Sequence, residues 1–209
     1  MEEKRKLNPL IPIVILLLVV VAILSVVCFK LFKTSIEYKD AYENLVAEEN
    51  EAKENAESYQ SLYNSLVYAM LDDAALAETI GNKTVNVWHN AIWNTENPET
   101  DKFTKVNGKF VSDFNDALAN LFRDADYSAD IALLKSKQNQ IKSDMKSMLN
   151  PPDGFGDAYK ALENMYNAYV TFTDIVLNCN GSLESFSNDF GDADEDILRK
   201  YKAAELYVR

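Results

Sequence analysis

An almost unbroken apolar run near the N-terminus sets the pattern of the whole chain. Residues 13–29 carry no charge, and residues 4–6 just before the run are all basic. A helix rises about 1.5 Å per residue, so residues 11–32 span roughly 33 Å, close to the hydrocarbon thickness of a bilayer. The backbone has no other hydrogen-bond partner in lipid, so a helix is expected despite the many Val and Ile residues. The pattern predicts a transmembrane anchor over residues 11–32, after a short basic tail over residues 1–10.

A cleaved signal peptide is the main alternative for this segment. Its apolar core is usually about 7–15 residues long and is followed by a small-x-small cleavage site. The run here is longer, and no good Ala-x-Ala site follows it. Cys28 would suit a lipoprotein signal, but bulky Val27 stands where a small residue is expected. We therefore expect an uncleaved signal-anchor and a single-pass protein of the cell membrane, with the lipid bilayer as one partner.

The orientation of the anchor depends on charges that nearly balance. Residues 4–6 are basic on one side, and Lys30, Lys33 and Lys39 lie on the other, so the positive-inside count is close to a tie. A short basic tail is the simpler part to retain in the cytoplasm. We expect a cytoplasmic N-terminus and a C-terminal domain outside the cell.

After the anchor, a heptad pattern continues without a break. Its members alternate at spacings of four and three: Tyr38, Tyr42, Leu45, Glu49, Ala52, Ala56, Tyr59, Tyr63, Leu66 and Met70. Glu49, Ala52 and Ala56 are poor seam residues, so residues 33–58 are predicted to form a polar helical stalk. A parallel coiled-coil homodimer through this stalk is the sharper alternative.

From Tyr59 the apolar face widens, which predicts burial against several helices over residues 59–209. The first helix is expected to end near Asn94, before Pro98. Four further helices are predicted, over residues 101–123, over 129–149, after 153–156, and from a Ser182 cap to the end. Short connections make neighbouring helices antiparallel. The fold class is therefore all-α, an up-and-down bundle of four or five helices on a stalk and anchor.

Two local signals qualify these helix boundaries. Asn107-Gly108 is a hairpin signal, but helical spacing on both sides favours a helix through it. Residues 126–128 are expected to form a turn with Ser128 as the next N-cap, and Gly181 is expected to adopt the left-handed conformation before Ser182.

The composition excludes one class of partner and narrows the rest. The chain has 209 residues, 33 acidic against 21 basic, and a net charge of −12. A nucleic-acid binder needs a basic face, so no nucleic acid is expected. The two cysteines, Cys28 and Cys179, lie in different regions, so the domain is expected to be stabilised by packing with Cys179 as a free thiol.

One aromatic cluster is a candidate contact with a protein partner. His89 is the only histidine, and it lies between Trp88 and Trp93. The two tryptophans are five residues apart and so face different sides of a helix, which suggests that one packs inward while the other marks a contact surface.

No other pattern indicates chemistry. His89 has no companion at metal-binding spacing, and the acidic run from Asp189 to Asp196 departs from a calcium loop at Ile197 and Ala203. The tyrosines of the first and fourth helices have the spacing of a core, with a ligand cleft as the alternative. No catalytic, cofactor-binding or metal-binding residue is predicted.

The pattern as a whole favours a non-enzymatic binding or scaffold module of the cell envelope, with a protein partner. The alternative is a ligand-sensing ectodomain that works through a membrane partner, because only about ten residues precede the anchor. A hydrolase or transferase is the third hypothesis, and purified activity abolished by mutating His89 or an acidic residue would support it.

Overall fold

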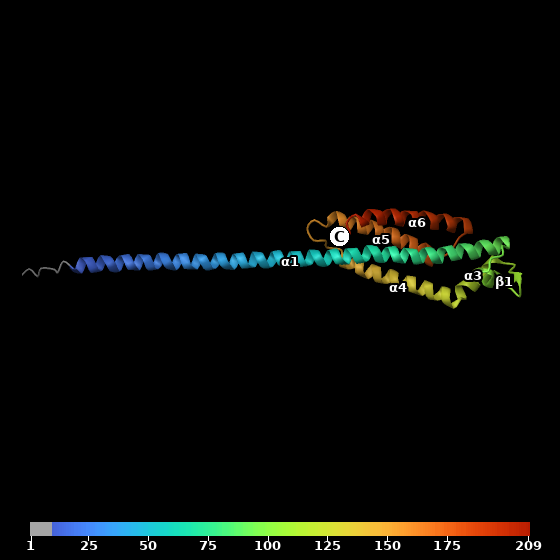
Figure 1. Ribbon diagram of the computed structural model, residues 1–209, viewed down its shortest axis with the longest axis horizontal. Coiled ribbons are helices and arrows are strands. Elements are labelled where there is room, and N and C mark those ends of the chain that lie inside the picture. Colours follow the sequence, from blue (N-terminus) through green and yellow to red (C-terminus); the bar gives the residue numbers. More distant parts are fainter. Residues whose placement is uncertain (1–9) are drawn as a thin grey trace, which may run out of the picture. The chain divides into compact units, whose positions relative to one another are not determined.

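The computed structural model describes residues 10–209 and is built almost entirely from helices (Figure 1). The elements in chain order are α1 (Leu10–Trp93), α2 (Asp101–Thr104), β1 (Lys105–Val106), β2 (Lys109–Phe110), α3 (Phe114–Arg123), α4 (Ala125–Ser147), α5 (Gly156–Leu177) and α6 (Leu183–Glu205). They divide into two compact units, Met1–Glu54 and Asn55–Arg209. The all-α prediction is confirmed, whereas residues 1–9 of the expected basic tail lie outside the described residues.

In the first unit, α1 carries the apolar run with its side chains exposed. This helix is long enough and apolar enough to cross a membrane, and its apolar part lies near the N-terminus. The Ser25 hydroxyl donates to the Val21 carbonyl at 2.8 Å, so this polar group is satisfied within the helix. Beyond the run, ion pairs one turn apart join Lys33 to Glu37 at 3.8 Å and Lys39 to Glu43 at 3.7 Å. Exposed pairs of this kind mark a helix surface suited to water.

The second unit packs the C-terminal part of α1 with α4, α5 and α6. Figure 1 shows α4 and the α5–α6 pair running alongside this part of α1, with short turns between successive helices. The core is built of aliphatic and aromatic side chains from all four helices, and its largest fully buried members include Tyr63, Tyr127, Tyr169 and Phe172. The core tyrosines need hydrogen-bond partners, and these partners connect the helices.

Two tyrosines of α1 tie down the ends of other helices. The Tyr59 hydroxyl donates to the Met148 carbonyl at 3.2 Å, just after α4. The Tyr63 hydroxyl donates to the Ala204 carbonyl at 2.7 Å, in the last turn of α6. Carbonyls at helix ends lack intrahelical partners, so these bonds satisfy them. The predicted burial of the Tyr59–Tyr63 stripe is confirmed.

Gly81 is a contact point between α1 and α6 that the sequence pattern did not reveal. A Cβ added there would lie 2.1 Å from Cε2 of Phe190. The glycine therefore lets the Phe190 ring lie directly against the α1 backbone. Because no side chain fits in this space, the packing of α1 against α6 requires glycine here, even though glycine has a low helix propensity.

The predicted continuous helix over residues 101–123 is wrong. α2 ends at Thr104, a two-stranded antiparallel hairpin follows, and α3 begins only at Phe114. Val106 pairs with Lys109 across the two-residue turn, where Asn107 has φ 52° and Gly108 has φ 76°. A type I′ hairpin turn requires positive φ at both positions, and Asn-Gly meets this requirement best. This local turn chemistry overrides the helical spacing on either side.

The predicted turn with a Ser128 cap is also wrong. α4 begins at Ala125, and the Asp124 side chain caps it by accepting from the Tyr127 amide at 3.2 Å. Tyr127 is then a buried core residue of the first turn, not a loop residue. The last boundary is confirmed: Gly181 has φ 84°, and the Ser182 side chain accepts from the Ser185 amide at the start of α6.

Candidate functional site

The two tryptophans near the end of α1 have opposite environments, as predicted from their spacing. Trp88 is 3% exposed and lies between Phe114 of α3 and Phe186 of α6, with ring centroids 5.9 and 6.1 Å away. Trp93, the last residue of α1, is 59% exposed. Trp88 therefore supports this end of the bundle from inside, and Trp93 presents an aromatic surface to the surroundings.

His89 joins Trp93 on the surface. It is exposed, and its ring stacks on the Trp93 ring with centroids 4.5 Å apart and planes 27° apart. Its Nδ1 lies 3.1 Å from Oδ1 of Asn90, and Asn90 in turn donates to the Thr100 hydroxyl at 2.9 Å. The histidine is thus held between an aromatic ring and an amide, an arrangement that orients a flat contact surface.

Large exposed apolar side chains gather at the same end of the bundle. Those between residues 92 and 122 are Ile92, Trp93, Val106, Phe114 and Phe122, whereas the others of this unit are spread from Tyr68 to Leu206. Figure 1 shows the hairpin and α3 at the C-terminal end of α1. Hydrophobic side chains gathered in one region of a surface are typical of a protein contact.

A charged network holds the segment after α1 in place. Lys105 Nζ donates to Glu96 and to Asp101, both at 3.0 Å, and lies 4.7 Å from the Phe110 ring centroid. These two carboxylates raise the pKa of Lys105, with Glu96 the larger cause. The Asn97 amide, and then Lys105, lower the pKa of Asp101. The hairpin is therefore fixed to the loop that precedes it, as a preformed binding surface requires.

A polar pocket of about 590 Å³ lies beside this network, between α1 and α2. Its lining residues are Thr79, Asn82, Lys83, Asn86, Glu99, Thr100 and Lys102. Lys102 is paired with Asp124 at 2.7 Å, and this ion pair, followed by the Tyr127 amide, lowers the pKa of Asp124. Lys83 lies 5.7 Å from the ring centroids of both Phe103 and Tyr127. The pocket can offer amides, hydroxyls and ammonium groups to a small polar ligand.

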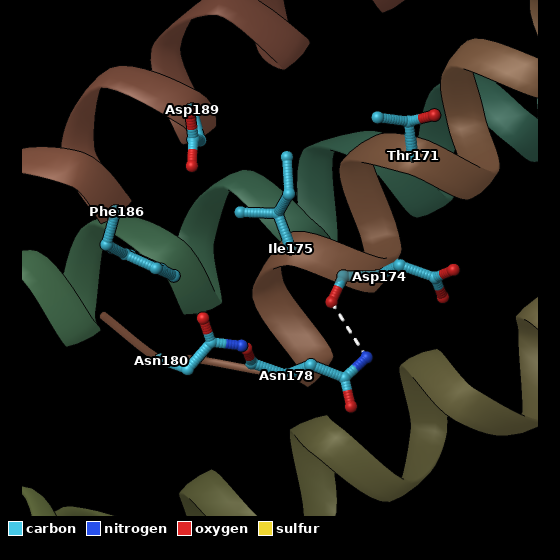
Figure 2. Close-up of a pocket in the computed structure, with 7 residues that line it drawn as sticks. All are labelled: Thr171, Asp174, Ile175, Asn178, Asn180, Phe186 and Asp189. Carbon is cyan, nitrogen blue, oxygen red and sulfur yellow. Dashed lines mark hydrogen bonds between the residues drawn. The ribbon is translucent and has the colours of Figure 1, made fainter.

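A second pocket, of about 440 Å³, lies between α5, α6 and their connecting turn (Figure 2). Figure 2 shows the carboxylates of Asp174 and Asp189 pointing in different directions, so they do not converge on one point. Asp174 already accepts from Gln138 Nε2 at 2.8 Å, and Asn178 donates to its backbone carbonyl at 2.9 Å. This pocket therefore lacks the convergent oxygens that a cation needs.

The tyrosine stripe is mainly core, with one exception. Tyr59, Tyr63 and Tyr169 are buried, whereas Tyr159 and Tyr166 are half-buried and line a pocket of about 260 Å³ between α4 and α5. Burial raises the pKa of both half-buried tyrosines above its usual value. The alternative prediction is a ligand cleft lined by these tyrosines, and the structure has this shallow pocket in its place.

The sequence pattern gave no sign of a buried carboxylate in the core. Asp73 of α1 is 1% exposed and accepts from Lys137 Nζ of α4 at 2.6 Å and from the Tyr169 hydroxyl of α5 at 3.2 Å. Burial, followed by the Asp73 charge, raises the pKa of Tyr169 far above its usual range. A carboxylate flanked by one lysine and one neutral phenol joins three helices. Asp73 is not among the lining residues of the three pockets described here, and its polar contacts link α1 to α4 and α5.

The remaining candidates from the sequence are the acidic run and Cys179. The run from Asp189 to Asp196 lies within α6, where Asp196 pairs with Arg199. Burial, followed by Glu78 and Glu195, raises the pKa of Asp194. Within residues 10–209 no group of three or more His, Cys, Asp or Glu side chains is arranged to hold a metal ion. Cys179 is a free thiol, as expected, and burial raises its pKa to about 11.

No protein-family model, no curated protein and no solved structure matches this chain. A functional assignment therefore has to come from the surface and the pockets themselves. Among these, the exposed His89–Trp93 pair combines aromatic area, a preformed scaffold and neighbouring apolar side chains.

Proposed function

We propose that this protein is a membrane-anchored binding module whose helical bundle lies outside the cell and contacts a protein partner through the end that carries Trp93. The observation that carries the proposal is the stacked His89–Trp93 pair on the surface of a bundle whose other tryptophan is buried. Among interface residues, tryptophan is enriched at the few positions that dominate the binding energy. Trp88 takes part as internal support for this surface.

Membrane anchoring is the second part of the proposal. The apolar part of α1 is long enough to span a bilayer, and its exposed Val, Ile and Leu side chains are those that lipid covers at no cost. The positive-inside count is close to a tie, and the orientation proposed follows from the short basic tail, which is the simpler part to retain in the cytoplasm. Vesicle flotation, resistance to alkaline extraction and protease access to the bundle in right-side-out vesicles test the anchor and its orientation.

Partner contact is tested by site-specific photo-crosslinking in membranes of the cells that naturally produce the protein. A photoreactive residue replaces Ile92, next to an intact Trp93, and the control carries it at Leu198 on α6, which is also exposed. We expect one discrete product from position 92 and none from position 198. Because losing a dominant contact costs at least about 2 kcal/mol, Trp93→Ala should reduce the product roughly thirty-fold. Equal products at both positions, or no effect of Trp93→Ala, would contradict the proposal.

A ligand-sensing domain is the second candidate, and the polar pocket of about 590 Å³ favours it. Lys83 lies at that pocket and contacts two aromatic rings, while amides and hydroxyls line the rest. A small polar ligand bound there would raise the melting temperature of the full-length protein by mass action. Loss of that shift in Lys83→Ala, with no change in Lys135→Ala on exposed α4 surface, would identify the pocket as its site.

A further inference from the structure

An apolar stripe continues along α1 past the end of the apolar run, without cover from the chain. Tyr38, Tyr42 and Leu45 are 74%, 69% and 64% exposed. Tyr59 and Tyr63, later members of the same alternating pattern, are buried in the bundle. The stripe therefore has the form of a helix–helix seam. Among the described residues, this chain covers the seam beyond Glu54 and leaves the part before Glu54 exposed.

Lipid does not account for the exposure of Tyr42 and Leu45. Counted from Phe32, Tyr42 lies about 15 Å and Leu45 about 20 Å further along the helix. The headgroup region adds only about 5–8 Å on each side of the hydrocarbon core. The Lys39–Glu43 ion pair flanks the seam and indicates an aqueous surrounding. Tyr38 is close enough to reach the interface, but Tyr42 and Leu45 are not.

The flanking residues fit a second copy of the same helix in parallel. In the heptad, Tyr42 takes position a and Leu45 position d, so Glu48 is at g and Lys53 at the following e. A parallel dimer places g of one helix beside the following e of the other, which brings Glu48 opposite the second copy's Lys53. An antiparallel pair would instead place g beside g and e beside e. This pair of opposite charges favours the parallel arrangement.

We propose that the stalks of two copies of this chain associate in parallel through Tyr38, Tyr42 and Leu45. The parallel orientation rests on the membrane anchoring proposed above, because both chains then leave the same side of the bilayer. Confinement to the membrane also raises their effective concentration, which compensates for a short seam. Glu49, in the next a position, ends the apolar part of the contact because two carboxylates would face each other, and the Glu48–Lys53 pair lies at this end.

Cysteine crosslinking of the full-length chain in liposomes tests this contact. In a Cys28→Ser/Cys179→Ser background, single cysteines replace Tyr42 or Leu45 in the seam. Matched controls replace Asp40 or Ala47, which take the outermost heptad position f. Seam positions should form disulfide-linked dimers at least about five-fold faster than the controls, because only they approach disulfide distance. Equal rates at all four positions, or no dimers at the seam, would overturn the proposal, and flotation of the same liposomes reports anchoring separately.

A charge exchange tests the orientation in the Leu45→Cys protein. Glu48→Lys should slow crosslinking, and adding Lys53→Glu should restore it, because the pair of opposite charges is then rebuilt in reverse. Glu54→Lys, at position f, should leave the rate unchanged. Glu49→Leu should accelerate crosslinking by extending the apolar seam. A double exchange that fails to restore the rate would overturn the parallel pairing.

Discussion

Leu45 and Leu66 lie on the same helix and have opposite surroundings. Leu45, in the first unit, is 64% exposed, whereas Leu66, in the second unit, is 2% exposed. Both residues occupy the same alternating pattern of apolar positions. The alternating pattern therefore specifies a helix and its apolar face. It does not specify which segment or molecule covers that face. In the second unit the cover is α4, α5 and α6.

The two units also differ in how exposed their ion pairs are. In the first unit, Lys39 pairs with an exposed Glu43 at 3.7 Å. In the second, Lys137 pairs with Asp73, which is buried between helices. An exposed pair contributes little to stability, whereas breaking a buried pair leaves a charge without compensation. Removing the lysine from each pair should therefore have unequal effects.

The largest expected effect is that of Lys137→Met. It leaves the Asp73 carboxylate buried with only the Tyr169 hydroxyl as a partner, which should lower the free energy of unfolding by about 3–5 kcal/mol. The matched change in the first unit, Lys39→Met, should stay within about 0.5 kcal/mol. Urea unfolding of the full-length protein in detergent micelles, followed by fluorescence, measures what each change does to the stability of the bundle, because the two tryptophans lie in the second unit.

A double variant separates the buried charge from the lost lysine contacts. Adding Asp73→Leu to Lys137→Met removes the uncompensated carboxylate and should recover most of the stability. If the double variant is as unstable as Lys137→Met alone, the cost comes from packing and the pairing argument is wrong.

The second prediction makes the same substitution at the two compared leucines. Leu66→Ala removes buried methyl groups and should lower the free energy of unfolding by about 2–5 kcal/mol. Leu45→Ala should change it by less than about 0.5 kcal/mol, since its side chain is exposed in the single chain. The urea midpoints of the two variants report the difference. Similar losses in both would show that the first unit is packed against something the bundle depends on.

Regular, local features of this fold were predictable from the sequence. The end of α1 near Asn94, the left-handed Gly181 and the Ser182 cap all follow from signals within a few residues. The hairpin at Asn107-Gly108 also has a local signal, but the helical spacing on both sides of it points to a helix instead. The turn is the stronger constraint, because Asn and Gly adopt positive φ at little cost and Gly is a poor helix former.

Contacts between distant segments were not predictable in this way. Asp73 and Lys137 look like ordinary surface residues in the sequence, and only the packing of α1 against α4 brings them together. In the sequence, Gly81 is a residue of low helix propensity within a helix. Its role in packing is visible only once Phe190 is placed against it. For the candidate site, the spacing of Trp88 and Trp93 predicted that one faces inward, but it could not tell which. That depends on Phe114 and Phe186, which arrive from other helices.

The third prediction concerns pH, through the buried tyrosines of the second unit. Burial raises the pKa of Tyr59 and of Tyr127 to about 12, against about 10 in an unfolded chain. Between pH 10 and 12 the unfolded chain loses these protons while the folded bundle keeps them, so stability falls as pH rises and is unaffected by these groups below pH 10. Tyr127 alone should account for about 2–3 kcal/mol. Urea unfolding at pH 9, 10 and 11.5 measures the loss, and Tyr127→Phe should reduce it.

The smallest expected effect on the free energy of unfolding comes from Gly→Ala substitutions, and its sign differs between two positions. The first unit contains no glycine, and α6 of the second contains Gly191, where an added Cβ meets nothing within 4 Å. Gly191→Ala should therefore stabilise the bundle by up to about 1 kcal/mol through helix propensity. Gly81→Ala gains the same propensity but drives a methyl group into the Phe190 ring, so it should lower the free energy of unfolding by about 1–3 kcal/mol. Adding Phe190→Leu to Gly81→Ala should recover part of that loss relative to Phe190→Leu alone. Stabilisation by both alanines would mean that α1 and α6 do not approach each other at Gly81, and that the second unit is packed more loosely than its buried aromatic residues indicate.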